Sequence, residues 1–208
     1  KYNRKSECLY HDVETFSAIA NKETSFAYPK EELLKNWKTI LLNQFHDILP
    51  GSSIRPVYDD SAEDYERVLN AGCKMAGDAM GSLVSKINLK EDSLVVFNTT
   101  GFQRKDAVVF DVDIDGDFAI FDKDGNEIPY QKTYNGKYIL IANVPAKGYT
   151  AYAIRRCAPS TFQNVNATAN KAETPFFTID FNDEGNISRL IHKESGRNVS
   201  PDGEAVGK

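Results

Sequence analysis

Cysteine, methionine, tryptophan and histidine are scarce in this sequence, and the shortage of cysteine excludes two classes of protein. Its 208 residues include three cysteines, two methionines, one tryptophan and three histidines. Cys8, Cys73 and Cys157 are too far apart for a C-x-x-C metal motif, and three cysteines are too few for a disulfide framework. Free thiols are typical of a reducing compartment, so we expect a cytoplasmic protein.

Long apolar runs and an excess of basic residues are also missing. No run approaches the ~20 apolar residues of a membrane-spanning helix, and residues 1–7 lack the apolar core of a signal peptide. The 25 basic residues are outnumbered by 30 acidic residues, which gives a net charge of -5. Phosphate backbones are bound by clustered positive charge, so we expect neither a nucleic-acid nor a membrane partner. The absence of an initiating methionine suggests a piece of a longer protein.

Three segments within residues 1–90 carry apolar residues at spacings of three and four, the period of a helix with one buried face. The first covers about 5–21 and places Val13 and Phe16 on that face. The second opens at Pro29, carries a broad apolar stripe that includes Leu34 and Leu41, and ends at 47–51. The third begins near Ser61 and continues to about 87. The pattern predicts a three-helix middle domain over residues 1–90.

After residue 90 the period changes from about 3.6 to 2, which indicates short strands. The strands are separated by turn sequences such as Asp124-Gly125 and Asn135-Gly136. This spacing favours a small antiparallel β-sandwich over a parallel sheet, and we assign it to residues 91–157. The expected strands are 93–97, 107–113, 118–121, 128–133, 137–143 and 149–155.

The last 51 residues divide into a linker and an incomplete β-domain. Residues 158–172, which are rich in Asn and Thr, are expected to form the linker. Residues 173–208 contain a predicted hairpin, with strands at 176–181 and 186–192. An isolated hairpin is marginally stable, so we interpret it as the start of a truncated C-terminal β-domain. The fold class is α+β.

Only one of the three histidines stands in a context that indicates chemistry. His11 lies on a periodic helix and His192 closes a strand, and structural roles explain both. His46 is expected in the last turn of an apolar helix beside Asp47, where unpaired carbonyl groups favour a cation. Such an imidazole can bind zinc with help from the carboxylate. The residues alone nevertheless favour a capping or core role, because zinc needs three or four protein ligands.

Residues 43–54, which read NQFHDILPGSSI, resemble the middle region of α-mannosidases of glycoside hydrolase family 38, in particular the bacterial and cytosolic type. The stretches 3–9, 57–60, 95–104 and 144–149 resemble neighbouring segments of that family, and 177–197 resembles the start of its large C-terminal β-domain. The resemblance implies that His46 is one of four ligands to a catalytic zinc ion and that Asp47 contacts the mannose ring. It also implies that the other ligands, the nucleophile and the acid/base carboxylate lie on an N-terminal β/α domain outside this chain.

The resemblance implies a zinc-dependent, retaining, exo-acting α-mannosidase that hydrolyses terminal α-mannosides of glycans or oligosaccharides in mannose metabolism. Retention requires two carboxylates about 5 to 5.5 Å apart, so the isolated chain is expected to be inactive and to bind zinc weakly at best. Its expected partners are an α-mannoside glycan, the missing N-terminal domain and the rest of the C-terminal domain. Apolar surface left exposed on the face of His46 would also favour a homo-oligomer.

Two alternatives remain open. A protein of the same family could act on mannosylglycerate or its phosphate. In a different class, the chain could be a non-catalytic carbohydrate-binding or adaptor module. That module would need an aromatic platform, for which Tyr130, Tyr134 and Tyr138 are the candidates, although cross-strand packing is their expected role.

Overall fold

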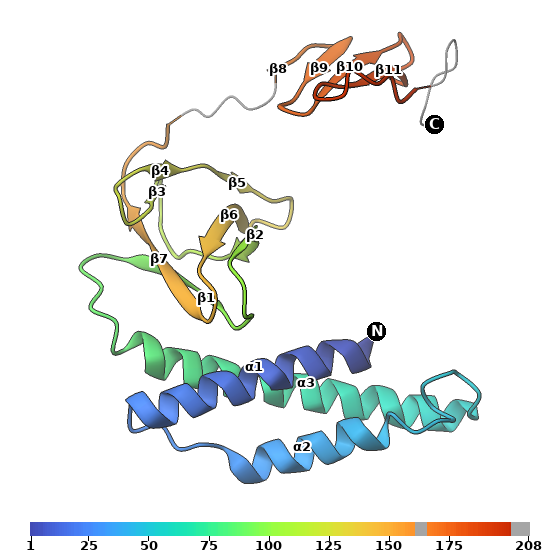
Figure 1. The fold of residues 1–208 in the computed structure, drawn as a ribbon, viewed down its shortest axis with the longest axis vertical. Helices are drawn as coiled ribbons and strands as arrows, with labels where there is room; N and C mark the ends of the chain where they lie inside the picture. The colour runs from blue at the N-terminus through green and yellow to red at the C-terminus, as the bar shows by residue number, and fades with distance from the viewer. Residues whose placement is uncertain (161–165, 201–208) are drawn as a thin grey trace. The chain divides into compact units, whose positions relative to one another are not determined.

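Three helices form the first part of the chain in a computed structural model that describes residues 1–160 and 166–200 (Figure 1). They are α1 (Tyr2–Glu23), α2 (Lys30–Leu42) and α3 (Arg55–Val84). The chain forms two units, Lys1–Cys157 and Ala158–Lys208, and all three helices belong to the first. None of the helices in the described residues is long and apolar enough to cross a membrane.

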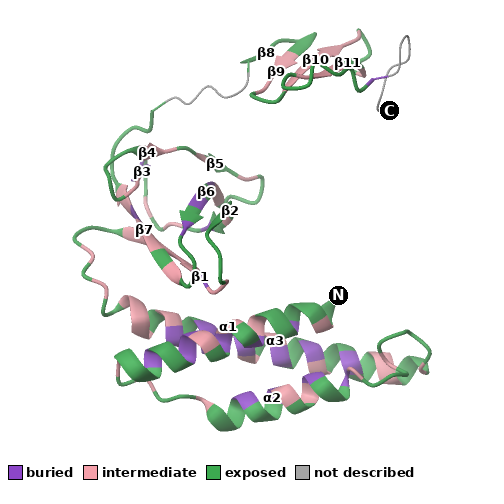
Figure 2. Ribbon diagram, viewed as in Figure 1, coloured by how far each residue is buried: buried purple, intermediate pink, exposed green. Residues whose placement is uncertain are grey.

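The helical core lies mainly where α1 and α3 face each other (Figure 2). Tyr10 and Val13 of α1 are fully buried there against Val68 of α3. Close approach is possible because position 72 has no side chain: an ideal Cβ on Gly72 would lie 2.7 Å from Leu9 Cδ2. The shape of the core therefore depends on this glycine as well as on the apolar stripes.

An indole joins α2 to α1. Trp37 of α2 donates a 2.9 Å hydrogen bond from Nε1 to Glu14 Oε1 of α1. Its ring also meets Tyr10 edge-on, with 5.7 Å between the centroids. A polar and an aromatic contact from one side chain thus hold α2 against α1.

Two helix boundaries differ from those expected. α2 ends at Leu42 rather than at 47–51, and α3 begins at Arg55 rather than near Ser61. The early start of α3 is explained by Pro56 in its first turn, because the fixed φ of proline suits that position and its missing N–H costs no helical bond. Ser61 is instead buried inside the helix.

Seven strands of the first unit form two antiparallel sheets, in the orders β1-β7-β3-β4 and β2-β6-β5. In β6, Leu140, Ala142 and Val144 are buried and alternate with exposed residues, as a strand with one buried face requires. The two sheets share one apolar core, which also includes Phe118 and Tyr152. The strands are β1 (Ser93–Asn98), β2 (Arg104–Phe110), β3 (Ala119–Phe121), β4 (Glu127–Ile128), β5 (Tyr130–Lys132), β6 (Tyr138–Val144) and β7 (Gly148–Arg155).

The helices and the sandwich meet through α1 and β1. The Thr99 hydroxyl donates a 2.6 Å hydrogen bond to Asp12 Oδ1, and Phe16 meets Phe97 edge-on with 5.4 Å between ring centroids. Ala20 and Ala79 complete this small apolar cluster. The expected α+β class, a three-helix bundle followed by an antiparallel sandwich, is confirmed, while the boundary between domains 1–90 and 91–157 stays a prediction.

The second unit contains a four-stranded antiparallel sheet in the order β11-β10-β9-β8. The predicted hairpin is present as β10 (Phe177–Phe181) and β11 (Ile187–His192). The difference lies in β8 (Asn166–Ala167) and β9 (Lys171–Glu173), which occupy part of the stretch 158–172 expected to be a linker. Strands of two and three residues are too short to show an alternating pattern. Residues 161–165 of that stretch and 201–208 of the expected C-terminal domain lie outside the described residues.

Candidate functional site

His46 and Asp47 lie in the turn between α2 and α3, residues 43–54, which we call the site turn. The expectation that His46 occupies the last turn of a helix is wrong, because α2 ends at Leu42. The buried Asn43 ends the helix there: its Nδ2 donates to Thr39 O and to Asp64 Oδ2, at 3.0 Å each. The second bond ties this end of α2 to α3.

Both candidate side chains face solvent. His46 Nε2 lies 3.7 Å from Asp47 Oδ2, and the two side chains are 78% and 57% exposed. The Phe45 ring lies beside the imidazole, with 4.2 Å between centroids. An accessible imidazole next to an accessible carboxylate can accept hydrogen bonds or ligate a cation, so the pair is chemically available.

The backbone of the site turn is bonded within itself around these side chains. The carbonyl oxygen of Phe45 accepts hydrogen bonds from the N–H groups of Ile48 (2.8 Å) and Leu49 (3.1 Å). Gly51 has a φ of +88°, a conformation that strongly favours glycine, and its N–H donates to Ile48 O at 3.3 Å. The segment is therefore a defined turn.

Two side chains anchor the site turn to its neighbours. Gln44 Nε2 donates to Asn3 Oδ1 (2.9 Å) and to Glu7 Oε1 (2.8 Å), both on α1. The Tyr58 hydroxyl, in the first turns of α3, contacts backbone atoms on both sides of the turn. Sequence reasoning missed both anchors, because neither glutamine nor tyrosine carries a local signal for such a role.

Exposed apolar side chains lie close to the pair in the sequence. Five large apolar side chains at the end of α2 and in the site turn are each more than half exposed, and we call them the apolar rim. They are Leu41, Leu42, Phe45, Leu49 and Ile54. Grouped exposed apolar residues are typical of interaction surfaces.

A complete metal site is not formed by the part of the chain that the structure describes. No three His, Cys, Asp or Glu side chains come together there in an arrangement that could hold a metal ion. A zinc ion needs three or four protein ligands, and the site turn offers one imidazole and one adjacent carboxylate. The residues that the structure describes therefore do not by themselves fit a zinc ion.

The other two histidines have local partners. His11 Nδ1 lies 3.3 Å from Asp12 Oδ1, and Asp12 also accepts the hydrogen bond from Thr99 that joins α1 to the sandwich. His192 Nδ1 lies 2.9 Å from the hydroxyl of Ser195 in the turn that follows β11. These contacts agree with the structural roles expected for both residues.

Of the three tyrosines considered as a sugar platform, Tyr130 and Tyr138 meet edge-on, with 5.6 Å between ring centroids, and both pack against Phe118. Tyr130 stacks on Phe118, with 4.7 Å between centroids, and its hydroxyl donates to the Phe118 carbonyl oxygen at 2.5 Å. Tyr138 meets Phe118 edge-on at 5.0 Å. Tyr134, in the turn between β5 and β6, is fully exposed. Two of the three therefore pack inside the sandwich.

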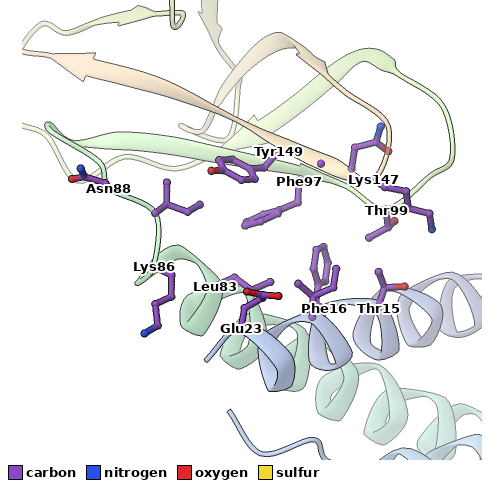
Figure 3. Close-up of a pocket in the computed structure, with 14 residues that line it drawn as sticks. Thr15, Phe16, Glu23, Leu83, Lys86, Asn88, Phe97, Thr99, Lys147 and Tyr149 are labelled. Carbon is purple, nitrogen blue, oxygen red and sulfur yellow. The ribbon is translucent and has the colours of Figure 1, made fainter. Parts of the chain in front are cut away.

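A cavity of about 500 Å³ lies between the helices and the sandwich (Figure 3). Phe16 projects into it from α1, and Phe97 and Tyr149 project from the sheet. It adjoins the C-terminal half of α1, whereas the anchors of the site turn contact the first turns of that helix. The hydroxyl of Thr99 in its wall already bonds Asp12. The walls of the cavity are chiefly apolar. His46 does not line it.

Comparisons with known proteins give a consistent result. Residues 1–83 match the family model described as "Alpha mannosidase middle domain". Mouse "Alpha-mannosidase 2C1" is 33% identical over 109 residues, which are 52% of this chain and 10% of the mouse protein. The crystal structure of an α-mannosidase from Enterococcus faecalis V583 superimposes with a TM-score of 0.70 at 18% identity, covering 95% of this chain and 28% of that chain. A glycosyl hydrolase family 38 protein from Enterococcus faecalis gives a TM-score of 0.66 at 20% identity, with 95% and 29% covered.

The chain spans about a tenth of the length of the mouse relative and less than a third of each solved chain. At 18% and 20% identity, the two structural matches show a shared fold. That fold extends beyond residue 83, because it covers the sandwich as well as the three helices.

Proposed function

We propose that this chain, whose residues 1–83 match the family model of the α-mannosidase middle domain, is part of a larger glycoside hydrolase family 38 enzyme that hydrolyses terminal α-mannosides. The observation that carries the proposal is the exposed His46–Asp47 pair on an anchored turn. In a folded domain of this size, a pair kept accessible within an apolar surface is suited to a site completed by another part of the enzyme.

We assign separate roles to the two side chains. His46 contributes one ligand to a zinc ion, and Asp47 accepts hydrogen bonds from hydroxyl groups of the mannose ring. The nucleophile and the acid/base carboxylate lie outside the chain. A retaining reaction needs those two carboxylates about 5 to 5.5 Å apart on either side of the glycosidic bond, so the isolated chain is inactive.

Zinc binding depends on donors from the rest of the enzyme. One imidazole and one neighbouring carboxylate are fewer donors than a zinc ion requires. Because metal affinity comes from the complete ligand set, this chain alone binds zinc weakly at best. When bound, the ion would hold sugar hydroxyl groups beside the reacting bond.

The apolar rim supports the same proposal. Its five side chains lie at the end of α2 and in the turn that carries His46 and Asp47, and Phe45 contacts the imidazole; in the complete enzyme we expect the catalytic domain to cover them. In the isolated chain the rim is free to meet a second copy, which is the basis of the expected homo-oligomer. Light scattering at protein concentrations from about 1 to 200 μM tests for such apolar association. Leu42→Glu should restore a monomer if the rim is the contact.

The three cysteines support a cytoplasmic location. Cys8, Cys73 and Cys157 are free and exposed, and such thiols persist in a reducing compartment. Thiol labelling of the protein in intact cells, before and after permeabilisation, would test this location.

The experiment that tests the function is substitution of His46 in the complete enzyme. We expect His46→Ala to lower turnover of an aryl α-mannoside at least about 100-fold and to release zinc, because a direct ligand is removed. His11→Ala is the matched control, since His11 also stands beside an aspartate and is exposed. Undiminished turnover and zinc content in His46→Ala would overturn the proposal. Preference for mannosylglycerate over the aryl mannoside would keep the site and change the substrate.

A further inference from the structure

We infer that Tyr58 is the positioning residue of the site turn: its hydroxyl fixes the backbone that presents His46 and Asp47. This inference rests on the proposed function for its effect on catalysis. The claim that Tyr58 restrains the turn rests on the hydrogen bonds of its hydroxyl.

The hydroxyl of Tyr58 joins the two sides of the turn. It accepts a 2.9 Å hydrogen bond from the N–H of Ser53. Its own proton is directed to the carbonyl oxygens of Asp47 and Ile48, at 3.3 Å and 3.5 Å. One oxygen atom therefore connects the residues that follow His46 with Ser53, two positions before α3.

The position of Tyr58 makes this connection rigid. Tyr58 lies three residues after the start of α3 at Arg55, so its backbone is held by the helix. The ring is half-buried, and a tyrosine side chain has only two rotatable bonds. A hydroxyl on such a support restrains the turn more strongly than a flexible side chain could.

Few other bonds could replace it. The other links across this part of the turn are long, from Ser52 Oγ to Asp47 O at 3.4 Å and from the Gly51 N–H to Ile48 O at 3.3 Å. Gln44 holds the other side of the His46–Asp47 pair by its bonds to α1. Tyr58 and Gln44 thus support the pair from opposite sides, and loss of the hydroxyl frees the peptide that follows Asp47.

The test uses Tyr58→Phe in the complete enzyme, with Tyr10→Phe as the matched control. Each substitution removes one phenol hydroxyl from the helical part, but the Tyr10 hydroxyl bonds Val68 and not the site turn. Hydrogen exchange followed by mass spectrometry on peptides covering 43–54 measures directly how strongly the backbone of the site turn is restrained. We expect faster exchange in Tyr58→Phe, above all at the Ser53 N–H, and unchanged exchange there in Tyr10→Phe.

Kinetics separate a positioning role from a merely structural one. Small misplacements of reacting groups lower rates strongly, so we expect about a tenfold lower kcat for Tyr58→Phe with little change in melting temperature. Tyr10→Phe should lower the melting temperature and leave kcat unchanged. Wild-type exchange over 43–54 or a wild-type kcat in Tyr58→Phe would overturn the inference. A silent His46→Ala would instead overturn the proposed function, and the exchange experiment would still decide whether Tyr58 holds the turn.

Discussion

The hydroxyl of Tyr10 on α1 donates a 2.9 Å hydrogen bond to the backbone carbonyl oxygen of Val68 on α3, in the fully buried centre of the helical part. Tyr10→Phe removes the donor and leaves that oxygen with only the helical N–H of Gly72 as a partner. We expect the free energy of unfolding to fall by about 1 to 2 kcal/mol. Urea unfolding followed by circular dichroism measures the change. Tyr134→Phe, at a fully exposed tyrosine, should leave the midpoint unchanged, and an equal fall in both variants would contradict this account.

The same tyrosine should make stability fall at alkaline pH. Burial, and after it the charges of Glu32 and Cys73, raise the pKa of Tyr10 well above its ordinary value of 10.0. The folded state then keeps the phenol proton more tightly than the unfolded state. The resulting stabilisation is complete below about pH 10, the pKa of an unfolded tyrosine, and is lost as the pH rises from there toward the folded pKa. The urea midpoint measured from pH 8 to 11 should therefore fall less steeply in Tyr10→Phe, and parallel curves would argue against it.

Two glycines of α3 should respond oppositely to alanine. A Cβ at position 72 would lie 2.7 Å from Leu9 Cδ2 and 2.8 Å from Tyr10 Cε2, whereas a Cβ at position 77 would meet nothing within 4 Å. We expect Gly72→Ala to destabilise the protein by about 1 to 3 kcal/mol through overpacking. Gly77→Ala should stabilise it by up to about 1 kcal/mol, because alanine is the better helix former. Thermal unfolding of the two variants tests both signs, and a stabilising Gly72→Ala would show that the helices are not in close contact there.

Asn98, at the end of β1, should be among the least replaceable polar residues of the sandwich. Its Nδ2 donates to the carbonyl oxygens of Phe102 (2.8 Å) and Pro145 (2.9 Å), and its Oδ1 accepts from the N–H (3.0 Å) and the hydroxyl (2.6 Å) of Thr100. Asn98→Ala removes these hydrogen bonds of the buried side chain, and we expect a loss of about 2 to 4 kcal/mol. Asn88→Ala is the control at an exposed asparagine. Equal unfolding midpoints for the two variants would refute the proposed role of Asn98.

The sequence pattern predicted the elements whose apolar faces repeat over several turns or strand residues. Val13 lies on the predicted face of α1 and is buried, and Leu140 does the same in β6. The pattern failed to predict burial where that burial depends on how many neighbouring elements cover a helix. Leu34 and Leu41 belong to the predicted apolar stripe of α2, yet they are 54% and 60% exposed, because α2 is covered on only one side within this chain.

The site was less accessible to sequence reasoning than the fold. His46 was singled out by its context beside Asp47, but the roles of both residues came from a resemblance, and periodicity placed His46 inside a helix. The anchors could not be predicted, because Gln44 bonds Asn3 across 41 residues of sequence and Tyr58 contacts Asp47 across 11. Pairs that meet only after the helices have packed leave no local pattern.

The bond from Trp37 to Glu14 has a consequence for spectroscopy, since Trp37 is the single tryptophan of the chain. Its indole emission will report on the environment between α1 and α2 and will be nearly blind to the β-sandwich. Near-ultraviolet tyrosine signals arise from both parts, because five of the ten tyrosines precede residue 90 and five follow it, among them Tyr130, Tyr138 and Tyr152 in the sandwich. If the two optical signals change at the same denaturant concentration, helices and sandwich melt together; separated curves would mean that the junction at Thr99 opens first.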